Sequence, residues 1–215
     1  MDFFTNRKHV DAYDNSVDIE KEVTESFNEA WKVTPSKQNF MPYRIHVIGP
    51  DAQEWKDKLY AMCLRNEGTV DNLSDEQLIK RYEHRPPSYH SITNCSYALI
   101  ITQRLVTKPN VCQQKRLDKG HVAEQMDPKK QDAINSIASF EVGLFCNALQ
   151  YYLLQKNIDS CYTGCFRNNK ENWKTLPFVT ETPIMIMTIG KGKVYTWQDP
   201  ENPRPTLDEI VSIVK

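Results

Sequence analysis

The sequence is poor in glycine and lacks the motifs that several large enzyme classes require. It has only seven glycines in 215 residues. It contains no Gly-x-Gly-x-x-Gly, no phosphate-binding loop ending in Gly-Lys-Ser/Thr, no His-Glu-x-x-His and no Gly-x-Ser-x-Gly. These patterns build a dinucleotide cradle, a nucleotide cradle, a zinc protease site and a serine nucleophile elbow, respectively. The sequence therefore disfavours all four kinds of site.

An excess of one charge and a long apolar run are also missing. The 27 Lys and Arg and the 28 Asp and Glu give a net charge of −1 and are mixed along the chain, which disfavours a nucleic-acid partner. The most apolar window, 137–154, contains Ser139, Glu141, Asn147 and Gln150 and fails as a membrane span. The N-terminus lacks the basic region and apolar run of a secretion signal. We expect a soluble, cytoplasmic protein without a membrane partner.

Cysteine is too sparse for a disulfide scaffold. Six cysteines are spread over the chain at 63, 95, 112, 146, 161 and 165, several of them inside apolar segments, so we expect reduced thiols. Cys161 and Cys165 could in principle bind a metal or cycle as a dithiol. Their spacing is not that of a zinc knuckle, and a structural role is favoured, so no metal site is predicted.

What is present predicts a single domain over residues 1–215. Apolar residues make up 40% of the chain, which is enough for one core or two closely packed ones. Alternation or continuous apolar runs predict strands at 43–49, 97–101 and 184–189. Helical spacing predicts a first helix that is capped by Ser16 and buries Trp31 among others. It predicts further helices over 52–62 and 128–155. Two more helices are expected to begin at capping boxes at 74–77 and 206–209. The polar stretch 105–126 is expected to be a long surface excursion. This order fits an α+β or three-layer α/β fold.

Three segments could carry function. Residues 6–14 form a short cationic cluster able to bind a phosphate, although alone they read more simply as a solvated terminus. Residues 34–43 form a rigid loop with hydroxyl and amide groups, which simple turn chemistry explains equally well. Residues 143–164 read as a core helix followed by a turn.

Taken together, these segments resemble the FMN-dependent nitroreductase family. Its Arg-Arg-x-Val-Arg-x-Phe start is matched by residues 7–13, and its Ala/Ser-Pro-Ser-x-x-Asn-x-Gln-Pro-Trp loop by residues 34–43. Its Gly-Leu-Gly-Ser-Cys-Trp-Ile-Gly segment is matched by residues 157–164, and a strand ending in Ile-Gly and a later Arg-Pro are matched by 188–190 and 204–205. The similarity covers nearly the whole chain, with residues 50–130 aligning least well.

The resemblance implies a three-layer α+β fold with a mostly antiparallel central sheet flanked by helices. It also implies a homodimer with the long central helix at the interface, an FMN cofactor, and ping-pong reduction of a small acceptor, aromatic or quinone-like, with NAD(P)H as donor. No side chain is expected to act as a nucleophile, since the flavin carries the redox step. The implied cofactor-binding residues fall into three groups. The residues implied around the FMN phosphate are Arg7, Lys8, His9 and Arg204, with Asp11 among them. The residues implied beside the isoalloxazine ring, expected from the partner subunit, are Pro35, Ser36 and Asn39. The residues implied at the reactive edge of the flavin are Thr163, Gly164 and Cys165.

The sequence departs from the family pattern at several of these positions. Asp11 stands where the family has Arg or Lys and brings a negative charge to the expected phosphate site. His9 replaces Ser, Met41 replaces Gln and Tyr43 replaces Trp, while Asn157 can adopt the left-handed conformation of the usual Gly. Two alternatives remain open. One is a non-catalytic flavin-binding or partner-binding protein on the same fold, and the other is a specialised flavin enzyme such as a reductive dehalogenase.

Overall fold

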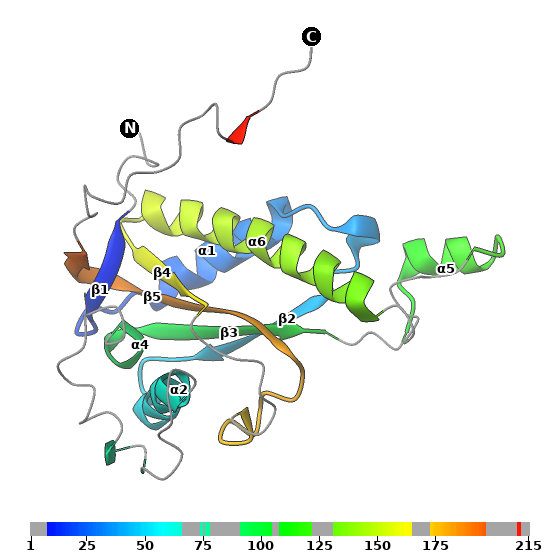
Figure 1. Ribbon diagram of the computed structural model, residues 1–215. Helices are drawn as coiled ribbons and strands as arrows, with labels where there is room; N and C mark the ends of the chain where they lie inside the picture. Colours follow the sequence, from blue (N-terminus) through cyan, green and yellow to red (C-terminus); the bar gives the residue numbers. More distant parts are fainter. Residues whose placement is uncertain are drawn as a thin grey trace.

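The structure is a computed structural model that describes residues 8–65, 74, 76–77, 91–104, 108–121, 131–164, 173–196 and 210–211. A central sheet lies between two helical layers (Figure 1). Helices α1 (Glu20–Val33) and α6 (Gln131–Gln155) cover one face, and α2 (Gln53–Arg65) and α4 (Ser91–Asn94) lie on the other. This confirms the predicted three-layer α+β fold.

The sheet is organised around β5, which spans Pro183–Thr196. The strand order is β1-β5-β3-β2, and β4 also pairs with β5. Every pairing among the described strands is antiparallel, as expected. The other strands are β1 (His9–Asp14), β2 (Tyr43–Ile48), β3 (Tyr97–Gln103) and β4 (Asp159–Thr163).

The centre of the sheet is buried on both faces, as the continuous apolar runs predict. In β3, Leu99 and Ile101 join the core under α1 and α6, while Ala98 and Ile100 join the core over α2. All four side chains are fully buried. Burying one large aliphatic side chain contributes about 1.5–3 kcal/mol, so this alternation fixes the register of β3 against β5.

The start of α1 differs from the prediction. The Ser16 hydroxyl hydrogen-bonds to Asp14 at 2.6 Å, and the Glu20 N–H instead donates to Asp18 Oδ1 at 3.0 Å. Ser16 lies too far ahead of the helix, which begins at Glu20, to reach its first N–H groups. Trp31, predicted on the buried face, is 62% exposed.

Two strands and two α-helices, α4 and α5, were not predicted. Strand β1 was read as a terminus, and β4 as the turn after the long helix. The expected surface excursion contains α5 (Val111–Leu117), which projects from the body in Figure 1. Its N-cap is Asn110, whose side chain forms a complete capping box with Gln113.

Other expectations are confirmed where the structure describes them. Helix α6 ends at Gln155, and Asn157 follows in the left-handed conformation with φ 56°. Ser74 and Gln77 exchange both hydrogen bonds of the predicted capping box. The predicted start of the long helix at 127–128 and the box at 206–209 lie outside the described residues. No helix in the described ranges is long and apolar enough to cross a membrane.

Candidate functional site

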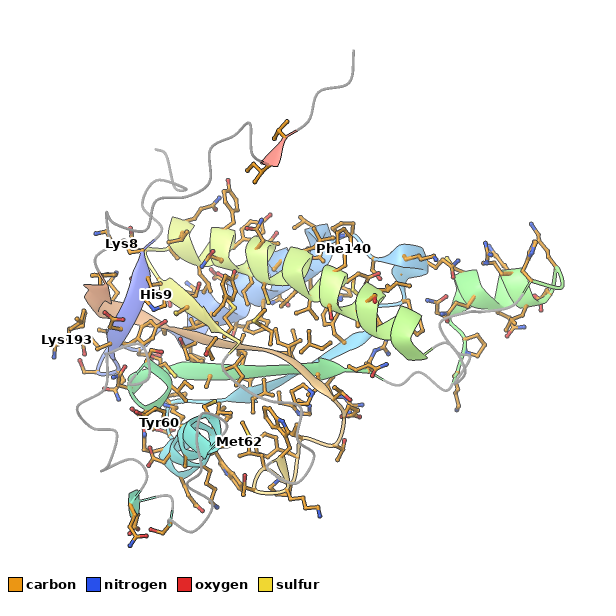
Figure 2. The ribbon with its side chains drawn as sticks, viewed as in Figure 1. Lys8, His9, Tyr60, Met62, Phe140 and Lys193 are labelled. Carbon is orange, nitrogen blue, oxygen red and sulfur yellow. The ribbon has the colours of Figure 1, made fainter. Side chains whose placement is uncertain are left out.

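The first group of candidate residues lies at the start of β1. Lys8 is exposed just ahead of the strand, and its Nζ lies 4.8 Å from the centre of the Tyr195 ring. The side chain of His9 is 44% exposed, and its Nε2 lies 3.8 Å from Oδ1 of Asp11, which is buried. Lys8 and His9 mark this end of the molecule in Figure 2. The strand therefore presents one lysine ammonium and one imidazole beside a buried carboxylate.

Cys161 completes this cluster from the neighbouring strand β4. Its Sγ lies 3.3 Å from Nδ1 of His9. Beneath it, the Tyr13 hydroxyl lies 2.9 Å from Thr188 Oγ1. Burial raises the pKa of Tyr13 well above its usual value, and the nearby Cys161 and Asp159 raise it further, so Tyr13 is neutral at physiological pH.

The second group lies on the loop between α1 and β2. Pro35 and Asn39 are exposed and Ser36 is half-buried. The short helix η1 (Lys37–Asn39) is irregular, because Gln38 and Asn39 have φ of 60° and 52°, and Met41 follows with φ 46°. Non-glycine residues seldom adopt this conformation, which costs about 1–2 kcal/mol per residue, so the surrounding structure has to enforce it.

Two side chains from the segment after β3 fasten this loop. The Arg104 guanidinium donates from Nε to the Met41 carbonyl at 2.8 Å and from Nη2 to the Phe40 carbonyl. The Asn110 amide donates to the Gln38 carbonyl at 2.9 Å. These bonds satisfy carbonyl groups that the irregular backbone leaves without partners, and they tie the loop to the base of α5.

Glu141 of α6 fastens the loop from the other side. Its carboxylate is 2% exposed, and Oε1 accepts from the Lys37 backbone N–H at 2.9 Å. Its second oxygen, Oε2, has no hydrogen-bond partner among the described residues. Glu141 lines a largely apolar cavity of about 780 Å³ together with Pro35, Ser36 and Phe140, and the Phe140 ring is 69% exposed. A buried carboxylate thus lies beside an apolar opening next to the loop, with Oε2 enclosed by the surrounding atoms.

The third group lies at the end of β4. Thr163 is the last residue of the strand and pairs with Ile186 of β5. Gly164 follows and is exposed, and no atom of the described residues lies within 4 Å of the position that a Cβ would take there. The backbone at this point is therefore accessible to a flat ligand.

The sequence of residues 5–191 matches the profile of the Nitroreductase family. The chain belongs to this family. A search of curated proteins gives no match.

Solved structures of nitroreductase-like proteins share the fold. A candidate NAD(P)H:FMN oxidoreductase of Staphylococcus epidermidis superposes with a TM-score of 0.67 at 18% identity, over 99% of this chain and 94% of that one. A candidate nitroreductase of Exiguobacterium sibiricum, solved with FMN, gives 0.64 at 16% identity, over 100% and 96%. Iodotyrosine deiodinase, solved with FMN and 3-iodo-L-tyrosine, gives 0.62 at 16% identity, over 95% and 96%.

Within this nitroreductase-family chain, the predicted site residues do not meet at one place. The cluster of Lys8, His9 and Asp11 lies at one side of the molecule, and the loop of Ser36 and Asn39 lies at the other (Figure 1). Arg7, Cys165 and Arg204 lie outside the described residues, so their roles stay predictions. Among the described residues, the expected phosphate-binding and ring-binding positions thus lie in separate parts of the chain.

Sequence reasoning missed the residues that support these two sets of positions. Glu141 was noted only as a charge that rules out a membrane span, and Arg104 and Asn110 fell in or beside the supposed surface excursion. Cys161 was considered only with Cys165. One indication of the contact with Cys161 was present in the sequence, namely that His9 stands where the family has Ser.

Proposed function

We propose that this chain binds FMN and acts as an NAD(P)H-dependent oxidoreductase that reduces a small aromatic or quinone-like acceptor. The match of residues 5–191 to the Nitroreductase family carries the proposal. Two proteins that share the fold support it, the candidate NAD(P)H:FMN oxidoreductase of Staphylococcus epidermidis and the candidate nitroreductase of Exiguobacterium sibiricum, which was solved with FMN.

The donor set at the start of β1 fits the phosphate end of FMN. Lys8 and His9 are exposed and offer an ammonium and ring N–H groups, which bind phosphate oxygens by charge and hydrogen bonding. Asp11 would repel the phosphate, but its carboxylate lies beside His9 Nε2 at 3.8 Å. Asp11 is 3% exposed, so a ligand at the surface of β1 meets the His9 ring and not the Asp11 carboxylate.

The loop between α1 and β2 fits the ring end of FMN. Its irregular backbone is fixed in advance by Arg104, Asn110 and Glu141, so little order has to be gained when a flat ring docks on Pro35 and Ser36. The adjoining cavity of about 780 Å³ is lined mainly by apolar groups, which suits an aromatic ligand.

We infer a homodimer from the separation of the expected phosphate-binding and ring-binding positions. A single flavin cannot contact β1 and the α1–β2 loop of the same protomer when these lie at opposite sides of it (Figure 1). In a symmetric dimer each interface is formed twice, so β1 of one copy and the loop of the other can share one ligand. The exposed Phe140 ring on α6 is an apolar group that such an interface would cover.

Bound FMN supplies the hydride chemistry, and the residues of this chain orient and insulate it. The α1–β2 loop would hold and orient the ring, because its backbone cannot rearrange without breaking the Arg104 and Asn110 bonds. Gly164 is exposed and follows the half-buried Thr163, so its backbone N–H would lie at the expected reactive edge. Glu141 would act on the ligand only through the loop, because its carboxylate is buried and holds the Lys37 backbone N–H.

Reductive dehalogenation is a second candidate, since iodotyrosine deiodinase shares the fold. The two candidates differ in acceptor, so the flavin reduced with NADH or NADPH without oxygen should be offered a nitroaromatic, a quinone and 3-iodo-L-tyrosine in turn. Reoxidation by the first two supports the proposal, and iodide release supports dehalogenation. A bound flavin that neither nicotinamide reduces would refute the NAD(P)H assignment.

A matched pair of variants tests the phosphate end. Lys8→Ala should weaken FMN binding by about tenfold, since a charge-assisted contact contributes about 1.5–3 kcal/mol. Lys32→Ala is the control, because Lys32 is an exposed lysine of α1 paired with Glu29. Flavin fluorescence titration measures both affinities. Equal affinities for the two variants would contradict the placement of the phosphate at β1.

A further inference from the structure

Cys161, His9 and Asp11 form a continuous chain of side chains across two strands. Cys161 Sγ lies 3.3 Å from His9 Nδ1, and His9 Nε2 lies 3.8 Å from Asp11 Oδ1. Cys161 and Asp11 are 6% and 3% exposed, whereas the His9 side chain is 44% exposed. Sγ also lies 3.8 Å from His9 Nε2 and 3.6 Å from the Tyr162 carbonyl oxygen, a second acceptor for the thiol proton. The solvent-exposed imidazole thus contacts the buried thiol along one edge and faces the buried carboxylate at Nε2.

This order of groups is that of a nucleophile, a base and an orienting carboxylate. The Asp11 charge at 3.8 Å, beyond hydrogen-bond distance, favours by electrostatic attraction the tautomer with its proton on Nε2, which leaves Nδ1 to accept the proton of the thiol. The same carboxylate stabilises the imidazolium once the proton has moved. A thiol paired with an imidazole is more reactive than an ordinary cysteine, because the thiolate is the nucleophilic form.

Two of the other buried thiols, Cys95 and Cys146, have surroundings that suppress reaction. Burial raises the pKa of Cys146 to about 12, and it raises the pKa of Cys95 to about 12 despite the nearby Lys56. Both thiols are therefore protonated at neutral pH. Cys112 is exposed on α5 and provides an ordinary accessible thiol in the same molecule.

We propose that Cys161 is a modification site, an activated thiol that reacts with low-molecular-weight disulfides. Cys161 passes its proton to His9 Nδ1, and the thiolate attacks one sulfur of the disulfide. The sulfur–sulfur bond of the reagent breaks, a mixed disulfide forms on Cys161, and the departing thiolate takes up a proton. The disulfide is the oxidant, and one thiol is released for each cysteine modified.

Modification at this place has a consequence that rests on the proposed function. The group attached to Cys161 would lie beside His9 and Lys8, where the FMN phosphate is proposed to bind. Modification and FMN binding should therefore exclude each other, so the thiol would couple flavin loading to the thiol–disulfide balance of its surroundings.

The test measures the modification rate of each cysteine in the flavin-free full-length chain. Glutathione disulfide is the reagent and iodoacetamide a second probe, with peptide mass spectrometry to resolve the sites. Cys161 should react at least about tenfold faster than Cys146, although both are buried, since proton removal by a positioned base contributes about a hundredfold or more. Equal rates at Cys161 and Cys146 would overturn the proposal.

Two variants separate activation from mere accessibility. His9→Gln should slow Cys161 by about tenfold or more while leaving the Cys112 rate unchanged, and Asp11→Asn should slow it less. The Cys112 rate and the circular dichroism spectrum report whether each variant is folded. A His9→Gln chain that is folded and modified at the wild-type rate would refute the role of His9.

The pH profile gives a readout that a structural role would not change. The titratable groups that the described residues place around Cys161 are His9, Asp11, Tyr13 and Asp159, with Lys8 at the exposed edge. Tyr13 does not titrate below alkaline pH, because its pKa is raised. Reaction at Cys161 should persist to lower pH in the wild type than in His9→Gln, and coincident profiles would contradict the proposal.

Protection by FMN forms a separate arm of the experiment. Fast, His9-dependent modification without protection by FMN would support the thiol site and count against the proposed position of the phosphate. Slow modification that FMN does not alter would overturn the thiol site while leaving flavin binding to be judged by titration.

Discussion

Arg104 holds the backbone of the loop on which the flavin ring is proposed to bind. The substitution Arg104→Met tests whether the loop depends on this side chain. Methionine keeps an unbranched stem of similar reach and removes only the guanidinium, which donates to the Met41 and Phe40 carbonyls. Hydrogen bonds from a charged donor contribute about 1.5–3 kcal/mol each. Arg104 is half-buried and water can replace part of both bonds, so we expect a loss of about 1–3 kcal/mol in the free energy of unfolding.

The same change should release the irregular backbone of the loop. Met41 has φ 46°, a conformation that costs about 1–2 kcal/mol outside glycine, and the guanidinium is one of the groups that enforce it. FMN affinity should therefore fall together with stability. Urea unfolding followed by circular dichroism measures the first quantity, and flavin fluorescence measures the second.

Arg44→Met is the matched control. Arg44 lies on β2 and pairs with Glu181 at 3.2 Å in an exposed position, where an ion pair contributes less than about 1 kcal/mol. If Arg104→Met and Arg44→Met lose equal stability and bind FMN equally well, the loop does not depend on the guanidinium and the argument fails.

Three further predictions concern the packing of the sheet and helices. Gly190→Ala should destabilise the fold by about 1–3 kcal/mol, because the added Cβ would lie 2.7 Å from Tyr13 Cδ1; an unchanged urea midpoint would contradict the close approach of β1 and β5. Gly143→Ala adds a methyl group with no atom within 4 Å and should raise the helical stability of monomeric chains by about 0.5–1 kcal/mol; a loss in the monomer would contradict this. Burial lowers the pKa of His46, so its contribution to the free energy of unfolding should be complete above the usual histidine pKa and be lost as pH falls through its lowered value. His46→Gln should reduce this fall in stability at acid pH, and a pH–stability profile identical to that of the wild type would contradict the prediction.

The sequence predicts best where apolar side chains decide the structure. The run at 97–101 could be recognised as a doubly buried strand because four consecutive apolar residues have to be covered on both faces, and the structure buries Ala98, Leu99, Ile100 and Ile101 fully. The long helix ends where its apolar pattern ends, at Gln155. These features depend on burial, which a single sequence displays directly.

The sequence predicts poorly where a distant segment decides the structure. Strand β1 alternates only weakly and exists because β5 extends to Thr196 and pairs with it. The left-handed residues after α1 depend on Arg104 and Glu141, which lie about 60 and 100 residues further along the chain and carry no local signal. The family resemblance located Ser36 and Asn39, but it could not identify the groups that fix them.

Likewise, the resemblance located His9 and Asp11 but not their contact with Cys161. That contact depends on the pairing of β1 and β4 with the same strand, β5. Strand β4 was read as a turn, so no reasoning from local pattern could bring the two side chains together.

Subunit complementation tests the central claim, a flavin shared between β1 of one copy and the α1–β2 loop of the other. One variant, Lys8→Glu, reverses the charge at β1, and the other, Ser36→Trp, fills the space at the loop. Each alone should bind little FMN. Co-expressed in equal amounts they should recover about a quarter of the wild-type flavin content, because half of the dimers are mixed and each mixed dimer has one intact site of two. No recovery in dimers shown to be mixed would contradict the shared site.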